Sequence, residues 1–100
     1  MGTHLRLTPA LRLVLTLLRD TPHEVWGLLL SSRSGLPTGT VYPILDRLER
    51  EGFVRSRWEP DNDRPGPRRR LYAMTDEGRD WTAGRMGRHD DLKGTDHEQV

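Results

Sequence analysis

The segment TGTVYPILDRLEREG, from Thr38 to Gly52, carries the strongest structural signal in the chain. Its apolar residues recur at the spacing of one helix face: Val41, Ile44, Leu45 and Leu48. Pro43 lies inside this run, although proline normally breaks the interior of a helix. If Thr38 or Thr40 caps the helix, Pro43 falls in or just after the first turn. Backbone N–H groups there have no partner within the helix, so proline costs little. The segment therefore predicts an amphipathic helix that ends at Gly52.

Two helices are expected before this segment. Thr8 followed by Pro9 places a hydroxyl cap before a proline at the first helical position. The apolar face Leu11, Val14, Leu15 and Leu18 follows it. The same Thr-Pro signal returns at residues 21–22 and predicts a second helix to about Ser32.

Two strands and a last helix are expected after the segment. FVRSRWE alternates with the period of a strand, PDNDRPGP is a loop by composition, and RRRLYAMT reads as a second strand. Thr75 then predicts the cap of a final helix over about residues 76–92, with a polar tail over 93–100. Trp26 and Trp58 are expected in the core. The fold class is therefore α+β, mainly α. Residues 1–92 should form one winged helix-turn-helix domain: three helices, a two-stranded β-hairpin wing and a short C-terminal helix.

The composition excludes several classes of function. The 100 residues contain no cysteine, which removes disulfides and thiolate metal sites. The four histidines lack metal-ligand spacing, and no nucleophile or acid–base constellation occurs, so we expect no metal, no cofactor and no enzyme activity. No stretch approaches the roughly 20 apolar residues of a membrane span. The N-terminus lacks a secretory pattern, which makes a cytoplasmic protein the expectation.

The charge pattern points to double-stranded DNA. The net charge is only +1, but RPGPRRR places four arginines in seven positions, at the end of the expected hairpin loop and the start of the strand after it. Beside it, the third helix carries polar side chains on its outer face, as a helix that reads a major groove does. The plainer alternatives stay open at this point. The helix face can be a solvated surface with an Asp46–Arg50 pair, and Asp61 and Asp63 can neutralise the arginines.

The same residues resemble a known family. GTVYPILDRLEREGFVRSRWE followed by GPRRRLYAMTDEGR closely resembles the PadR family of bacterial transcriptional regulators. The motif begins with Gly-Thr-x-Tyr-Pro, continues as Leu-x-Arg-Leu-Glu and ends in a wing with paired arginines. The match is specific over some forty residues, whereas the N-terminal helices fit in layout only.

The resemblance implies a winged helix that binds operator DNA as a homodimer, usually a repressor, and often with a small-molecule effector. Combined with the charge pattern, it gives these expected DNA-binding residues: Thr38, Gly39, Thr40, Tyr42, Pro43, Arg47, Arg64, Arg68 and Arg69. Trp81 is a candidate for stacking on a flat ligand. Family members commonly carry a longer C-terminal helical part that forms the dimer, so Leu5 and Leu7 are alternative interface residues or core. The rival interpretation is a protein-interaction module or adaptor without strong DNA specificity.

Overall fold

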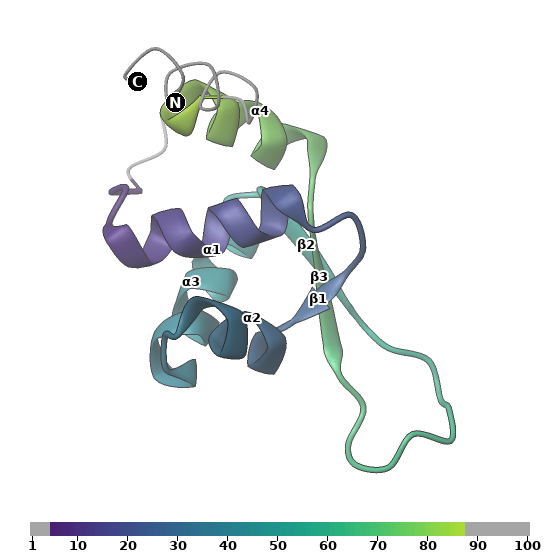
Figure 1. Ribbon diagram of the computed structural model, residues 1–100. Coiled ribbons are helices and arrows are strands. Elements are labelled where there is room, and N and C mark those ends of the chain that lie inside the picture. The colour runs from purple at the N-terminus through teal and green to yellow at the C-terminus, as the bar shows by residue number, and fades with distance from the viewer. Residues whose placement is uncertain (1–4, 88–100) are drawn as a thin grey trace, which may run out of the picture.

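The computed structural model describes residues 5–87 and confirms the α+β class (Figure 1). In this part of the chain the elements are α1 (Pro9–Asp20), β1 (Val25–Trp26), α2 (Gly27–Ser34), α3 (Thr38–Arg50), β2 (Val54–Trp58), β3 (Arg70–Met74) and α4 (Asp76–Met86). None of its helices is long and apolar enough to cross a membrane. Gly87 follows α4 directly, and the expected continuation toward residue 92 and the tail lie outside the described residues.

Two of the four expected helix starts are confirmed. Thr8 Oγ1 accepts a hydrogen bond from the Leu11 amide at 3.1 Å, and Thr75 Oγ1 accepts one from the Gly78 amide at 3.0 Å. Both hydroxyls satisfy amides that have no partner inside the helix. The second helix was placed wrongly, because residues 21–26 do not continue as a helix and α2 begins only at Gly27.

The chain before α2 forms a strand that the sequence pattern did not predict. Val25 and Trp26 pair antiparallel with Tyr72 and Leu71, so the sheet has three strands in the order β1–β3–β2. The pairing is favoured because Val25 is β-branched and only 1 % exposed, and the central strand β3 offers it a ladder of hydrogen bonds. The predicted two-stranded hairpin is present as β2 and β3, in the register Val54↔Met74 to Trp58↔Arg70.

The start of α3 also differs from the expectation. Its N-cap is Pro37, which makes no side-chain cap bond, and neither threonine caps the helix. Pro43 is therefore the sixth helical residue rather than part of the first turn. Because proline has no N–H, the carbonyl of Gly39 receives no bond from position 43. The packing of the apolar face compensates for this loss, since Val41, Leu45 and Leu48 are completely buried.

The core lies between the helices and one face of the sheet. Apolar side chains of α1, α2 and α3 meet Val25, Val54, Tyr72 and Met74 there, and Leu5 joins them from the N-terminal segment, which assigns it to the core. Trp58 is not part of it, contrary to expectation: it is 57 % exposed at the end of β2, because β2 runs out of the domain into the hairpin loop. Trp26 is only half-buried.

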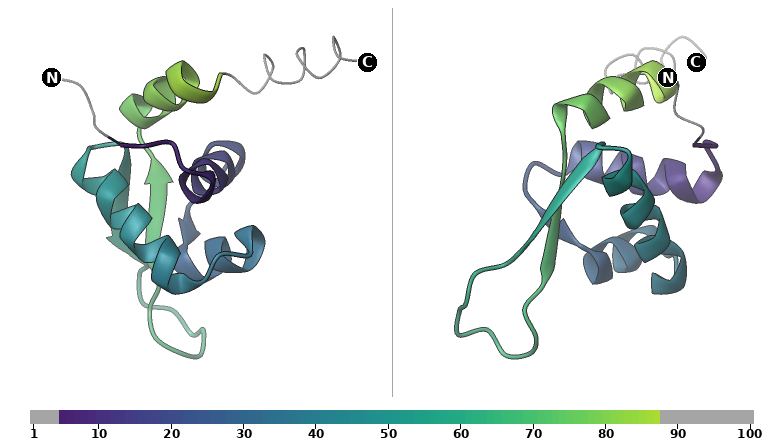
Figure 2. Two further views of the ribbon diagram at one scale, coloured as in Figure 1. Left: turned by 90° about the vertical axis from the view of Figure 1, so that its left-hand side faces the viewer. Right: turned by 180° about the vertical axis from the view of Figure 1, so that it is seen from behind.

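The two ends of the molecule differ in character. Figures 1 and 2 show α4 at one end, next to α1, and the loop between β2 and β3 reaching out at the opposite end. We call this loop, residues 59–69, the wing loop. The beginning of α3 lies at the same end as the wing loop (Figure 2).

Candidate nucleic-acid interface

The outer face of α3 is a polar stripe. Tyr42, Pro43, Asp46, Arg47 and Arg50 are exposed along it. Asp46 and Arg50 form an ion pair of 3.0 Å one turn apart, with both side chains about two-thirds exposed. A pair this exposed adds little to stability, typically below about 1 kcal/mol. Arg47 is therefore the cation of the stripe that has no ion pair in the described chain. Two small cavities lie beside it, and Leu5 and Arg6 line one of them.

The first turn of α3 presents backbone donors at the same end. The amides of Thr40 and Val41 both bond to the Pro37 carbonyl. Those of Thr38 and Gly39 are the first two of the helix, where no carbonyl of the helix itself is in reach. Such donors, together with the helix dipole, favour an anion such as a phosphate. Thr38 and Thr40 are half-buried and Gly39 is exposed.

The space for the Tyr42 ring comes from a glycine that the sequence analysis did not single out. A Cβ atom on Gly27 would lie 2.3 Å from Cε1 and 2.7 Å from Oη of Tyr42. The hydroxyl end of the tyrosine ring therefore lies directly against the backbone at the start of α2. Even so, Tyr42 stays 43 % exposed, so part of its side chain is accessible from outside.

The wing loop is held together by Glu59. This residue is 8 % exposed, and its carboxylate accepts hydrogen bonds from Arg64 Nη2 and from the Arg69 amide, the latter at 2.9 Å. The bond from Arg64 is the main reason why the pKa of Glu59 lies below its usual range. Its own amide donates to the Arg69 carbonyl at 2.8 Å, which closes the base of the loop.

The arginines of the wing loop have different surroundings. Arg64, expected as a DNA contact, turns inward: it also donates to the carbonyls of Pro65 at 3.0 Å and Pro67 at 2.7 Å. Arg68 points outward, with 56 % of its side chain exposed and a long ion pair of 3.5 Å to the exposed Asp61. Arg69 places its guanidinium 4.0 Å above the ring of Trp26. The pairing with Asp61 that the sequence left open is thus present, but weak.

A groove of about 370 Å³ separates the wing loop from the beginnings of α2 and α3. We call it the wing groove; it is lined by Trp26, Gly27, Leu28, Tyr42, Trp58, Arg64, Pro67, Arg68, Arg69 and Arg70. Arg70 stacks on Trp58 at 5.2 Å and donates to Ser56, which in turn donates to Glu49 of α3. This chain of bonds connects the sheet to α3. The groove combines guanidinium groups with aromatic rings, a composition suited to a phosphate backbone.

Trp81, the candidate for ligand stacking, lies at the other end of the molecule. Its ring stacks on Phe53 at a centroid distance of 4.9 Å, and Arg85 covers it at 5.1 Å. The structure therefore does not bring Trp81 together with the residues of the wing groove. In the described part of the chain, no group of three or more histidine, aspartate or glutamate side chains is arranged to hold a metal ion.

A polar helix face and a basic loop at one end of a small domain define a winged-helix DNA-binding protein. The model of the PadR-like family of transcriptional regulators matches residues 14–83. The chain belongs to this family, which confirms the resemblance and makes it a transcriptional regulator rather than an enzyme.

Solved structures agree with the assignment. A PadR family regulator from Clostridium difficile matches with a TM-score of 0.68 and 21 % identity, over 91 % of this chain and 97 % of that one. One from Eggerthella lenta matches with a TM-score of 0.60 and 26 % identity, over 89 % and 79 %. Bacillus subtilis PadR, solved in complex with operator DNA, matches with a TM-score of 0.67 and 23 % identity, over 84 % of this chain and 49 % of that one. A search of curated proteins finds no significant match.

Proposed function

We propose that this regulator is a homodimeric repressor that binds a palindromic operator in the bacterial cytoplasm. One observation carries the proposal: Tyr42, at the beginning of the polar stripe of α3, lines the same basic, aromatic groove as the arginines of the wing loop. A helix in the major groove and a loop on the neighbouring backbone fit this arrangement. In a two-fold dimer the two α3 helices read half-sites about one helical turn apart.

The residues divide into three roles. Tyr42 and Arg47 set the sequence preference, because they are exposed on the stripe and carry groups that reach base edges. The amides of Thr38 and Gly39 receive a phosphate, with Thr40 and Pro43 shaping this turn. Arg68 supplies affinity without sequence preference, as an exposed cation on the wing loop does.

Arg64 and Arg69 take parts that the sequence did not suggest. Arg64 organises the wing loop through Glu59 rather than contacting DNA. Arg69 shares its guanidinium between the ring of Trp26 and the strand of DNA that passes through the wing groove. A small-molecule effector stacked on Trp81 remains part of the proposal; it would have to displace Arg85, which covers the ring at 5.1 Å.

The first test is selection of bound sequences from random duplex DNA with the full chain, followed by titration of the winning duplex and a scrambled control at two salt concentrations. A palindromic winner bound much more tightly than the control supports a dimeric, sequence-specific regulator. Weak binding to every duplex alike would refute it and favour the adaptor. Sedimentation at micromolar concentration provides an independent check, since a monomer would contradict the homodimer.

The second test separates the roles of individual residues. Arg68→Ala is expected to weaken winner and control duplex equally and to reduce the slope of log affinity against log salt by about 0.9 for each phosphate that Arg68 neutralises. Tyr42→Phe should weaken the winner alone. Arg12→Ala is the matched control, because Arg12 is exposed on α1 outside the wing groove. An unchanged salt slope in Arg68→Ala would remove the wing loop from the interface.

A further inference from the structure

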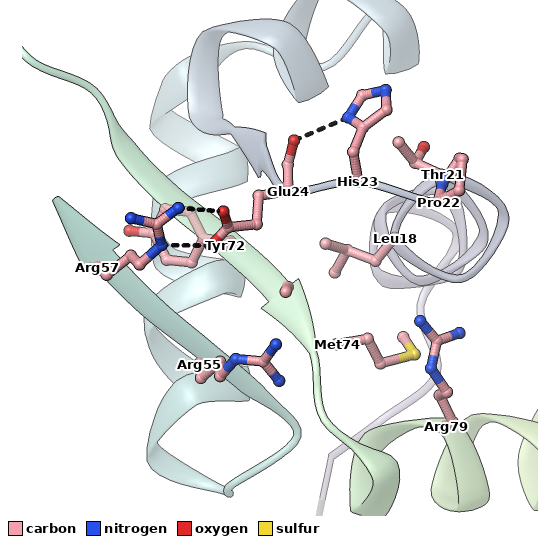
Figure 3. Close-up of a pocket in the computed structure, with 11 residues that line it drawn as sticks. Leu18, Thr21, Pro22, His23, Glu24, Arg55, Arg57, Tyr72, Met74 and Arg79 are labelled. Atoms are coloured by element: carbon pink, nitrogen blue, oxygen red, sulfur yellow. Dashed lines mark hydrogen bonds and ion pairs between the residues drawn. The ribbon is translucent and has the colours of Figure 1, made fainter. Parts of the chain in front are cut away.

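A second cavity lies away from the wing loop, where the end of α1, the sheet and the beginning of α4 meet (Figure 3). We call it the sheet pocket. Its volume is about 530 Å³, within the range of roughly 300–1,000 Å³ that small-molecule sites occupy. Its walls come from four elements, α1, β2, β3 and α4, and from the segment 21–24, so a molecule bound here can contact all of them.

The charges around the sheet pocket do not balance. Glu24 is the only acid among the described residues that line it, beside Arg55, Arg57 and Arg79. Arg57 grips both carboxylate oxygens of Glu24, with bonds of 2.8 Å from Nε and 2.6 Å from Nη2, and thereby holds the pKa of this carboxylate below its usual range. The negative charge of Glu24 is thus already neutralised by Arg57. Two positive charges remain around the cavity.

The two remaining cations are Arg55 and Arg79. Neither guanidinium group makes a hydrogen bond or an ion pair within residues 5–87, and Arg55 acts on Glu24 only as a nearby charge. Figure 3 shows both guanidinium groups extending toward the cavity, one from β2 and the other from α4. Like charges that two elements hold around the same space repel each other, and an anion between them turns this repulsion into attraction. Two guanidinium groups match a ligand with two negative charges better than a monoanion.

The floor of the sheet pocket is apolar. Leu18 of α1 and Met74 of β3 line it and are only 3 % and 4 % exposed, so they belong to the core and form a fixed surface. Such a floor receives the carbon skeleton of an organic molecule, while the arginines above it receive charged oxygens. Inorganic ions alone would leave this apolar surface unused.

We propose that the sheet pocket binds a small organic dianion, a phosphate monoester or a dicarboxylate, between Arg55 and Arg79. The ligand joins β2, which leads into the wing loop, to α4 at the opposite end of the molecule. The site shares no lining residue with the wing groove, and its occupation does not require the proposed DNA binding.

The test is a titration of the isotope-labelled full chain with glycerol 3-phosphate, succinate or acetate at constant ionic strength, followed by NMR. For glycerol 3-phosphate or succinate we expect saturable shifts of the amides of residues 23, 24, 55, 73 and 79, with an affinity at least tenfold above that of acetate. The tighter of the two dianions identifies the ligand class. Equal affinity for acetate, or shifts confined to the wing loop, would overturn the proposal.

Variants locate the site. Arg55→Gln and Arg79→Gln should each weaken the tighter dianion at least tenfold, whereas Arg12→Gln, an exposed arginine of α1 outside the pocket, should change it less than twofold. Because Arg55 and Arg79 are exposed and unpaired in the described chain, both variants should keep the melting temperature of the unsubstituted protein. Unchanged affinity in a folded Arg55→Gln or Arg79→Gln variant contradicts the proposal.

Discussion

Two glycines of α4 should respond to the same substitution with opposite signs. A Cβ atom on Gly78 would lie 2.0 Å from the Phe53 carbonyl oxygen and 2.8 Å from its carbon, whereas ordinary contact begins at 3.4 Å. A Cβ atom on Gly84 would meet nothing within 4 Å. An alanine side chain therefore clashes with the backbone at position 78, whereas position 84 has room for it.

The structure gives the size of the effect. The obstacle at position 78 is backbone, and the Phe53 oxygen is fixed by a 3.0 Å bond from the Thr75 amide. Overpacking of this kind costs about 1–3 kcal/mol, against which the better helix propensity of alanine returns at most about 1 kcal/mol. Gly78→Ala should therefore destabilise the fold by about 1–2 kcal/mol. Gly84→Ala, near the end of α4, should stabilise it by about 0.5 kcal/mol.

Urea and thermal denaturation followed by circular dichroism measure both changes. For a domain of this size 1 kcal/mol shifts the melting temperature by about 4–8 °C. We expect Gly78→Ala to melt roughly 5–15 °C below the unsubstituted protein and Gly84→Ala slightly above it. If Gly78→Ala were as stable as the unsubstituted protein, the close packing of α4 on the turn after α3 would be wrong. An equal loss of stability in both variants would indicate instead that α4 tolerates no substitution of its glycines.

Three further predictions concern the interface end. In Gly27→Ala the new Cβ atom should push the end of the Tyr42 side chain aside, so the free energy of unfolding should change by less than about 1 kcal/mol. The affinity for the selected duplex should fall severalfold, whereas the affinity for a scrambled duplex should not. Unchanged specificity would contradict this. Glu59→Gln removes a negative charge, yet it should weaken DNA binding in a titration, because the wing loop loses its anchor. Since the pKa of Glu59 is lowered in the folded state, its stabilisation is present above the ordinary value of 4.5 and lost as the pH falls through the folded pKa, so melting temperatures of Glu59→Gln should fall less in acid. Trp58→Ala should cost less than about 1 kcal/mol in urea denaturation, because this side chain is exposed; a loss of several kcal/mol would return it to the core.

Much of the fold could be predicted from local sequence signals. The cap residues Thr8 and Thr75 act on amides three positions away, so their roles are visible in the sequence itself. The buried face of α3 follows equally from its periodicity. The PadR assignment depends on motifs of α3 and the hairpin, which are continuous in the chain.

The errors arose where distant residues decide the structure. Val25 and Trp26 form a strand because β3, more than forty residues later, pairs with them. Trp58 was expected in the core by its residue type, but the hairpin carries it out of the domain. The expectation that Arg64 contacts DNA stays a prediction, but nothing local in the sequence shows that the Glu59 carboxylate accepts a hydrogen bond from it. Gly27 could not be recognised from the sequence, because its missing side chain leaves room for the ring of Tyr42, which comes from another helix.

The order of the strands has a consequence for solubility. With β3 in the middle, β2 has one side without a strand partner in the described sheet, and unpaired edges invite pairing with other molecules. Arg55 and Arg57 alternate along this short strand, and charged side chains on an edge oppose such pairing. Arg55 and Arg57, which line the sheet pocket, thus also protect the chain from aggregation through its sheet. A regulator that evolved a different ligand at this pocket would have to keep a charge on this edge.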